Sequence, residues 1–172
     1  VGDLVWAAGD SMARGFIIGA TAGRTTLNGE GLQHQDGHNF MMFSMVPCCV
    51  SYDPTFAFEM AVIIQDGLQR MMHDHENVFY YITAMNENYH HPAMPDGIET
   101  DLLKGLYCLK PSQAKHSKRV QLLGSGAILL EVLKAAECLE KEFDICADVW
   151  SATSFNELRK DMESVARYNR LH

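Results

Sequence analysis

Val78-Phe-Tyr-Tyr-Ile-Thr-Ala-Met85 is the stretch that decides the fold of this chain. Aromatic and β-branched residues dominate it, and it is apolar on both faces, which is typical of a central strand in a parallel sheet. Residues 46–52 form a second, shorter run of this kind, with Pro47 at its beginning. Between the two runs, Asp53-Pro54 is a favourable helix start, a cap followed by proline at the first helical position. Strand, helix and strand with short joints predict a parallel βαβ unit and an α/β fold.

The intervening helix and the segment before the first strand complete this unit. From Asp53 the helix is expected to reach about Met72. It is expected to bury one apolar face, made of Phe58, Ala61, Val62, Leu68 and Met72. Residues 2–19 carry apolar side chains near the helical period, with Asp3 placed to cap the start, and predict another helix.

The second half of the chain repeats the α/β pattern after a change of character. Residues 90–118 contain several prolines and a basic run, and only residues 106–109 resemble a strand. Beyond them the pattern predicts strands at 120–123 and 147–151, an amphipathic helix at 128–143, and a last helix that begins at the Ser154–Glu157 capping box. The predicted domains are residues 1–95 and 119–172, joined by a linker at 96–118.

Composition and charge argue against several classes of function. The net charge of −8 leaves no basic stripe for nucleic acid. No apolar run approaches the roughly 18–20 residues needed to cross a bilayer, so no membrane partner is expected. The five cysteines are odd in number and lack C-x-x-C spacing, which predicts reduced thiols in a cytoplasmic protein. A chain that begins on Val1 within a predicted helix also suggests a fragment or a processed product.

No metal site is expected from the histidines and cysteines. Cys48 and Cys49 would point to opposite faces of a strand, so they cannot easily coordinate one metal ion together. His73-Asp-His75 and His90-His91 lie in polar connections, which favours solvated side chains.

The main candidate for chemistry is the segment Gly23–His38. It reads Gly-Arg-Thr-Thr-Leu-Asn-Gly-Glu-Gly-Leu-Gln-His-Gln-Asp-Gly-His, with four glycines, two acids and two histidines. Glycine lets backbone approach a ligand closely, and the acids and imidazoles donate, accept and titrate. A plain polar surface loop is the alternative, and composition alone favours it.

Two further stretches are weaker candidates. Asn86-Glu-Asn-Tyr89 follows the central strand, at the sheet edge where ligands of parallel α/β proteins bind, although a polar strand exit is an equal alternative. Gly124-Ser-Gly126 could cradle a phosphate, but it lacks the third glycine and the downstream acid, which favours a plain βα turn.

Six motifs together resemble one known family. They are Gly2-Asp-Leu-Val-Trp-Ala-Ala-Gly-Asp10, the loop from Ala22 to His38, Tyr52-Asp-Pro-Thr-Phe-Ala-Phe-Glu59, Tyr80-Tyr-Ile-Thr83, Asn86-Glu-Asn-Tyr89 and Val120-Gln-Leu-Leu-Gly-Ser-Gly126. Over almost the whole chain they resemble the homodimeric bacterial-type E1 component of pyruvate dehydrogenase, in the transketolase superfamily. The loop is also similar to the shorter Gly-Glu-Asp-Gly-Pro-Thr-His loop of transketolases, where this chain reads Asn28-Gly-Glu-Gly-Leu-Gln-His34.

The resemblance implies a fold and an activity. The chain would hold the later part of a transketolase-like pyrimidine-binding domain, followed by the first part of a transketolase C-terminal domain. The family decarboxylates pyruvate on thiamine diphosphate with Mg²⁺, and it passes the acetyl group to the lipoyl domain of the E2 acetyltransferase. It works as a homodimer with active sites between subunits.

Three residues of the loop take roles from the resemblance. His34 falls on the substrate-facing histidine and Glu30 on the loop's acid, so both are expected to be catalytic. An imidazole can hydrogen-bond the carboxylate of pyruvate and exchange protons near neutral pH, and a nearby carboxylate favours its charged form. His38 is assigned to substrate binding in a supporting role.

Other parts of the family's machinery are missing from this sequence. It has no Gly-Asp-Gly motif with its later Asn, which the family uses for the diphosphate and Mg²⁺, and the glutamate that activates the cofactor would precede Val1. The isolated chain is therefore expected to be inactive, with the cofactor held mainly by parts not present. Cys48 and Leu130 also depart from the polar and basic residues expected at their positions.

Two other interpretations stay open. The chain could be a non-catalytic remnant that serves as an interaction or assembly piece, because a truncated sheet exposes apolar edges. A transketolase-like enzyme acting on sugars is disfavoured, because Leu32-Gln33 replaces Pro-Thr before the histidine.

Overall fold

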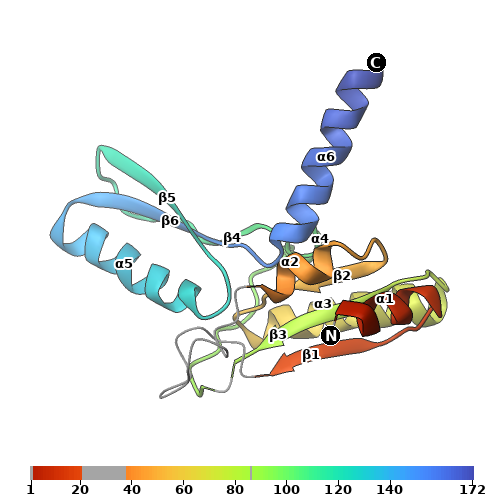
Figure 1. Cartoon of the computed structure of the whole chain (residues 1–172). Coiled ribbons are helices and arrows are strands. Elements are labelled where there is room, and N and C mark those ends of the chain that lie inside the picture. Colours follow the sequence, from red (N-terminus) through yellow and green to blue (C-terminus); the bar gives the residue numbers. More distant parts are fainter. Residues whose placement is uncertain (1, 21–37, 86) are drawn as a thin grey trace.

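The computed structural model describes residues 2–20, 38–85 and 87–172, which form two three-stranded sheets with their helices (Figure 1). The first sheet contains β1 (Phe16–Ala20), β3 (Phe79–Ala84) and β2 (Cys49–Tyr52) in the order β1-β3-β2. Both pairings are parallel, so β3 is the central strand that the apolar run predicts. The expected α/β fold with a parallel sheet is confirmed in this half of the chain.

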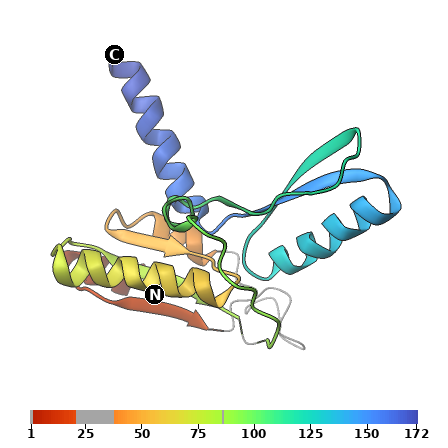
Figure 2. The ribbon, with the colours of Figure 1, turned by 180° about the vertical axis from the view of Figure 1, so that it is seen from behind.

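Helices cover both faces of the first sheet, which explains why β3 is apolar throughout. Figures 1 and 2, seen from opposite sides, place α1 (Gly2–Asp10) and α3 (Ala57–Leu68) on opposite faces. Phe79 and Tyr81 of β3 pack on the side of α1 and α2 (Asn39–Ser44). Tyr80 and Ile82 pack on the side of α3. This alternation is the period of two that a strand imposes on its side chains.

The second sheet has the order β4-β6-β5, from β4 (Tyr107–Lys110), β6 (Ile145–Ser151) and β5 (Lys118–Gly124). β5 pairs with β6 in parallel, and β4 pairs with β6 antiparallel. The predicted helix over 128–143 is confirmed as α5 (Ile128–Glu142). Its expected apolar face packs in one core cluster with β5 and β6, through Leu129, Val132, Leu133, Ala136 and Leu139.

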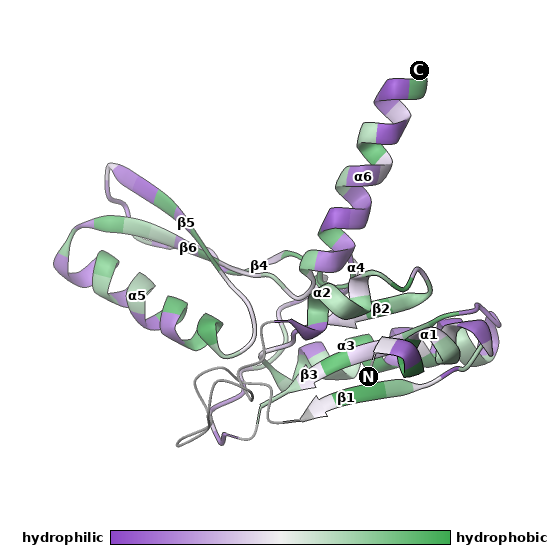
Figure 3. Cartoon of the chain, in the orientation of Figure 1, coloured by the Kyte–Doolittle hydropathy of each residue, from purple (hydrophilic) through white to green (hydrophobic). Residues whose placement is uncertain are grey.

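The last helix begins where its capping box predicts. The Ser154 hydroxyl accepts a hydrogen bond from the Glu157 N–H (3.0 Å), and α6 (Phe155–Leu171) follows. None of its residues is buried, and the helix extends away from both sheets (Figure 1). Figure 3 shows it as mainly hydrophilic with interspersed hydrophobic residues.

The helix expected over residues 2–19 was partly wrong. It ends at Asp10, and Met12 adopts a left-handed backbone conformation (φ 54°). Residues 16–20 form β1 instead, with Phe16 paired to Tyr80. The Phe-Ile-Ile run prefers a strand once a central partner such as β3 is available, and this long-range pairing overrides the local helical period.

The start and buried face of α3 also differ from the prediction. The helix begins at Ala57, not after Asp53, because Glu59 satisfies the backbone of its first turn. It continues as a π-helical turn, η2 (Gln69–His73), which agrees with the expected end near Met72. The buried positions are Glu59, Ile63, Gly67 and Met71, whereas Leu68 and Met72 of the expected face are exposed.

The stretch expected as a linker over 96–118 contains two elements of the folded body. They are α4 (Glu99–Lys104) and β4, the latter close to the strand-like run at 106–109. Leu102 of α4 and Tyr107 of β4 are buried in the core on the α3 side of the first sheet. Proline and glycine favoured a connection here. The stretch is nevertheless anchored, because the side chains of Leu102 and Tyr107 are buried in the core of the first sheet.

The buried face of α3 can be tested with a matched pair of truncations. Ile63 is fully buried and Leu68 is 47% exposed on the same helix. Ile63→Ala should lower the free energy of unfolding by about 2–5 kcal/mol, since it leaves a cavity in the core. Leu68→Ala should cost less than about 1 kcal/mol. Urea unfolding of both variants measures this, and a larger loss for Leu68→Ala would show that the face predicted from sequence is the buried one.

Candidate functional site

The candidate site lies where the carboxyl ends of β2 and β3 meet the second sheet. Asp53 follows β2, and its carboxylate accepts hydrogen bonds from the hydroxyls of Thr83 on β3 (2.5 Å) and Ser125 beyond β5 (2.7 Å). The Asp53 N–H donates to the carbonyl of Thr153, which follows β6 (2.7 Å). Asp53, expected as a helix cap, therefore connects the end of β2 to the ends of three other strands.

The glycine turn at 124–126 faces the same carboxylate. Gly126 has a left-handed backbone (φ +50°), and a Cβ on it would lie 2.6 Å from an oxygen of Asp53. The Gly126 N–H donates to the Asp53 carbonyl (3.2 Å). The Asp53 side chain thus packs against the turn that connects β5 to α5, where its negative charge disfavours a phosphate.

A buried carboxylate, Glu59, sits beside this contact. Its Oε2 accepts from the N–H groups of Thr55 (2.5 Å) and Phe56 (2.9 Å) at the start of α3. Its Oε1 accepts from the hydroxyls of Tyr107 on β4 (2.6 Å) and Ser151 on β6 (2.6 Å). Every contact is a donor, which suits an ionised carboxylate. Burial and this negative charge raise the pKa of Tyr107, so its hydroxyl stays a donor.

Sequence reasoning missed the role of Glu59. Its only local signal is the position three residues after Phe56, which fits the acid of a helix capping box. Its two hydroxyl partners are 48 and 92 residues away in the chain, and no sequence pattern connects them.

A cavity of about 170 Å³ opens between the end of β3 and the start of α3. Tyr89 and His91 form one wall, with their rings 4.7 Å apart, and Thr55 and Thr83 lie among the other lining residues. The Tyr89 hydroxyl donates to the Thr55 carbonyl. Burial, with the charges of Glu59 and Glu87 adding to it, raises the pKa of Tyr89 to about 12, so the phenol is neutral at physiological pH.

His91 closes the cavity at the first turn of α3. Its Nδ1 accepts a hydrogen bond from the Ala57 N–H (3.1 Å), one of the donors that a helix start leaves without an intrahelical partner. Because Nδ1 accepts, the ring proton of the neutral imidazole sits on Nε2. The cavity therefore combines an apolar floor with a phenol and an imidazole held in fixed orientations.

The predicted loop residues fall mostly outside the described parts. His34 and Glu30 lie outside them, so their roles stay predictions, as does that of His38. His38 itself is exposed at the N-cap position of α2, where its carbonyl accepts from Met42 (3.0 Å). Of the second candidate stretch, Asn86 also lies outside the described residues, and Tyr89 lines the cavity.

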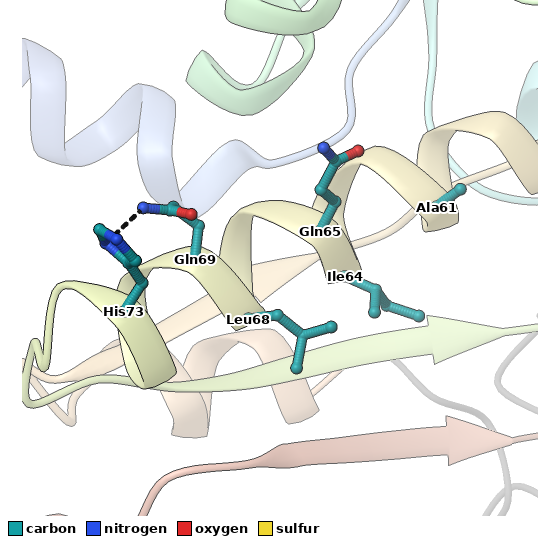
Figure 4. Close-up of a pocket in the computed structure, with 6 residues that line it drawn as sticks. All are labelled: Ala61, Ile64, Gln65, Leu68, Gln69 and His73. Carbon is teal, nitrogen blue, oxygen red and sulfur yellow. Dashed lines mark hydrogen bonds between the residues drawn. The ribbon is translucent and has the colours of Figure 1, made fainter.

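A second hollow runs along the flank of α3 and is shown in Figure 4. Ala61, Ile64 and Leu68 make it mainly apolar. Its imidazole, His73, is hydrogen-bonded to Gln69 (2.9 Å), and neither an acid nor a hydroxyl lines it. Ala61 and Leu68, which the helical period placed on the buried face, are exposed and line this hollow instead. The hollow does not supply the acid or hydroxyl groups of an active site.

Across residues 2–20, 38–85 and 87–172, no three His, Cys, Asp or Glu side chains come together as a metal site would require. The helices in these ranges are too short or too polar to span a bilayer. All five cysteines are free thiols.

Both halves of the chain match models of known protein families. Residues 1–92 match the pyruvate dehydrogenase E1 component middle domain, and residues 105–169 match the transketolase-like C-terminal domain. The chain belongs to the pyruvate dehydrogenase E1 family. The expectation from the motifs is confirmed, and the transketolase-like identity of the second half agrees with it.

Individual E1 relatives match along the whole chain. It is 58% identical over 172 residues to the pyruvate dehydrogenase E1 component of Pseudomonas aeruginosa, covering 100% of this chain and 20% of the relative. It is 56% identical over 173 residues to that of Escherichia coli K12, covering 100% and 19%. The chain thus spans about a fifth of the length of the curated relatives it matches.

Solved transketolases share the fold at low identity. The transketolase of Campylobacter jejuni aligns with a TM-score of 0.58 and 22% identity, over 84% of this chain and 21% of that one. A Pichia stipitis transketolase in complex with sedoheptulose-7-phosphate gives a TM-score of 0.58 and 17% identity, over 91% and 22%. At this identity the likeness shows the fold alone.

Proposed function

We propose that this chain is a segment of a pyruvate dehydrogenase E1 component. In this proposal the whole enzyme decarboxylates pyruvate and transfers the acetyl group to the lipoyl domain of its E2 partner. It works as a cytoplasmic homodimer, and this segment supplies parts of two domains, proposed at 1–95 and 119–172, with β4 of the intervening stretch added to the second. The observation that carries the proposal is an identity of 58% that extends through the entire chain, including the loop at 23–38.

The proposed chemistry of this chain rests on the loop residues. The His34 imidazole hydrogen-bonds the carboxylate of pyruvate and holds or releases a proton near neutral pH. Glu30 favours the charged imidazole, and His38 supports the substrate side of the loop. The described cavity lies at the carboxyl edge of the first sheet, where ligands of parallel α/β sheets bind, which supports a ligand site at this edge.

Thiamine diphosphate with Mg²⁺ is the cofactor that this proposal requires, and it supplies the electron sink for decarboxylation when bound. Neither the sequence motifs nor the described residues of this chain indicate a site for its diphosphate and metal ion. The sequence contains no Gly-Asp-Gly motif, and no three potential ligands meet in the described residues. We therefore assign cofactor binding to other parts of the enzyme.

The role of His34 can be tested in an enzyme of full family length that carries this segment. His34→Ala should reduce pyruvate turnover by about 10²–10⁴-fold, the range expected for a lost acid–base group. His73→Ala is the matched control, because His73 is an exposed imidazole at the far end of α3. Steady-state turnover of both variants decides the matter. A near-normal rate for His34→Ala would reduce the loop to scaffolding.

The assignment of the cofactor to other parts predicts a simple binding result. Titration of the isolated chain with thiamine diphosphate and Mg²⁺ should give no calorimetric heat beyond dilution. The full-length enzyme provides the positive control. Saturable binding to the isolated chain would mean that it contains cofactor ligands that its sequence and described residues do not reveal.

A further inference from the structure

Glu59 is a charged side chain with no exposed surface, and its two carboxylate oxygens accept hydrogen bonds from different parts of the structure. Oε2 accepts hydrogen bonds from the N–H groups of the two residues just before α3, and Oε1 accepts from two hydroxyls on strands of the second sheet. An ion removed from water must be compensated by such donors. The segment that leads into α3 and the second sheet therefore each supply two of the four donors that surround this buried carboxylate.

The first turn of α3 is also a wall of the cavity at the end of β3. Thr55 and Phe56 both line that cavity, and both donate to Glu59. The Thr55 carbonyl accepts from Tyr89, another residue that lines the cavity, while the Thr55 hydroxyl donates to the Gly126 carbonyl (2.8 Å). The shape of the cavity thus depends on contacts that begin in the second sheet.

The geometry points to Glu59 as a positioning residue, which transmits the placement of β4 and β6 to the first turn of α3 and so fixes the cavity wall. The coupling follows from the contacts of Glu59, Tyr107 and Ser151 alone. Its effect on turnover rests on the proposed function. In that setting the second sheet, which carries no predicted catalytic residue, helps to hold the catalytic edge of the first.

Truncation of Glu59 to alanine is a poor test, because a variant that leaves four donors without an acceptor can fail to fold. Removal of one donor from the second sheet is milder. Tyr107→Phe deletes a single hydroxyl from a side chain that is 1% exposed. Tyr52→Phe is its matched control, since Tyr52 is 2% exposed and its hydroxyl donates to the Leu103 carbonyl (2.7 Å) rather than to Glu59.

The primary measurement is amide hydrogen exchange in the enzyme of full family length. Tyr107→Phe should speed exchange at the Thr55 and Phe56 amides by about tenfold, because their acceptor loses one of its anchors. Tyr52→Phe should leave these two amides unchanged. Ser151→Ala, which removes the other second-sheet donor, should reproduce the effect of Tyr107→Phe.

Pyruvate kinetics provide the second measurement. Tyr107→Phe should lower kcat several-fold, up to about tenfold, with KM for pyruvate nearly unchanged. The reason is that a displaced cavity wall affects stabilisation of the transition state more than it affects binding of pyruvate. Tyr52→Phe should retain the wild-type kcat. A fall of kcat in Tyr107→Phe and Tyr52→Phe alike would show general loosening and overturn the positioning role.

The two measurements separate the inference from the proposed function. Unchanged Thr55 and Phe56 exchange in both Tyr107→Phe and Ser151→Ala overturns the coupling, whatever the enzyme does with pyruvate. A wild-type enzyme without pyruvate turnover overturns the proposed function. In that case faster exchange in Tyr107→Phe still supports the coupling through Glu59.

Discussion

The carboxylate of Glu59 imposes the constraint on which the two halves of this structure depend. A buried ion loses its hydration, at an effective cost of several kcal/mol, unless hydrogen bonds replace it. The four donors come from the start of α3 and from strands β4 and β6. The sheets can separate only if this carboxylate loses half its donors, which makes their contact specific as well as favourable.

That constraint brings the carboxyl ends of strands from both sheets to one place. Asp53 adds a second carboxylate to the contact, bound by Thr83 and Ser125 from opposite sides. The cavity beside β3 lies next to this junction and shares Thr55 with it. E1 relatives match along both halves, and this junction joins the two halves through side-chain hydrogen bonds.

Local patterns in the sequence predicted the elements that depend on local forces. Three such elements are the apolar run of β3, the amphipathic period of α5 and the Ser154 cap of α6, each determined by residues close together in the sequence. The pairing of Phe16 with Tyr80, the burial of Ile63 in place of Leu68, and the donors of Glu59 depend on partners far along the chain, which periodicity cannot supply. The composition of the loop predicted it as a candidate site, and the motifs predicted the family. The cavity lined by Tyr89 and His91 could not be predicted, because it forms only when the chain folds.

The central claim is that Glu59 and Tyr107 stabilise each other across the two sheets. A double-mutant cycle with Glu59→Gln and Tyr107→Phe, measured by urea unfolding of the chain, tests it most directly. The account predicts a coupling free energy of about 1–3 kcal/mol, the range for a hydrogen bond to a charged group. Additivity of the two substitutions within about 0.5 kcal/mol would contradict it.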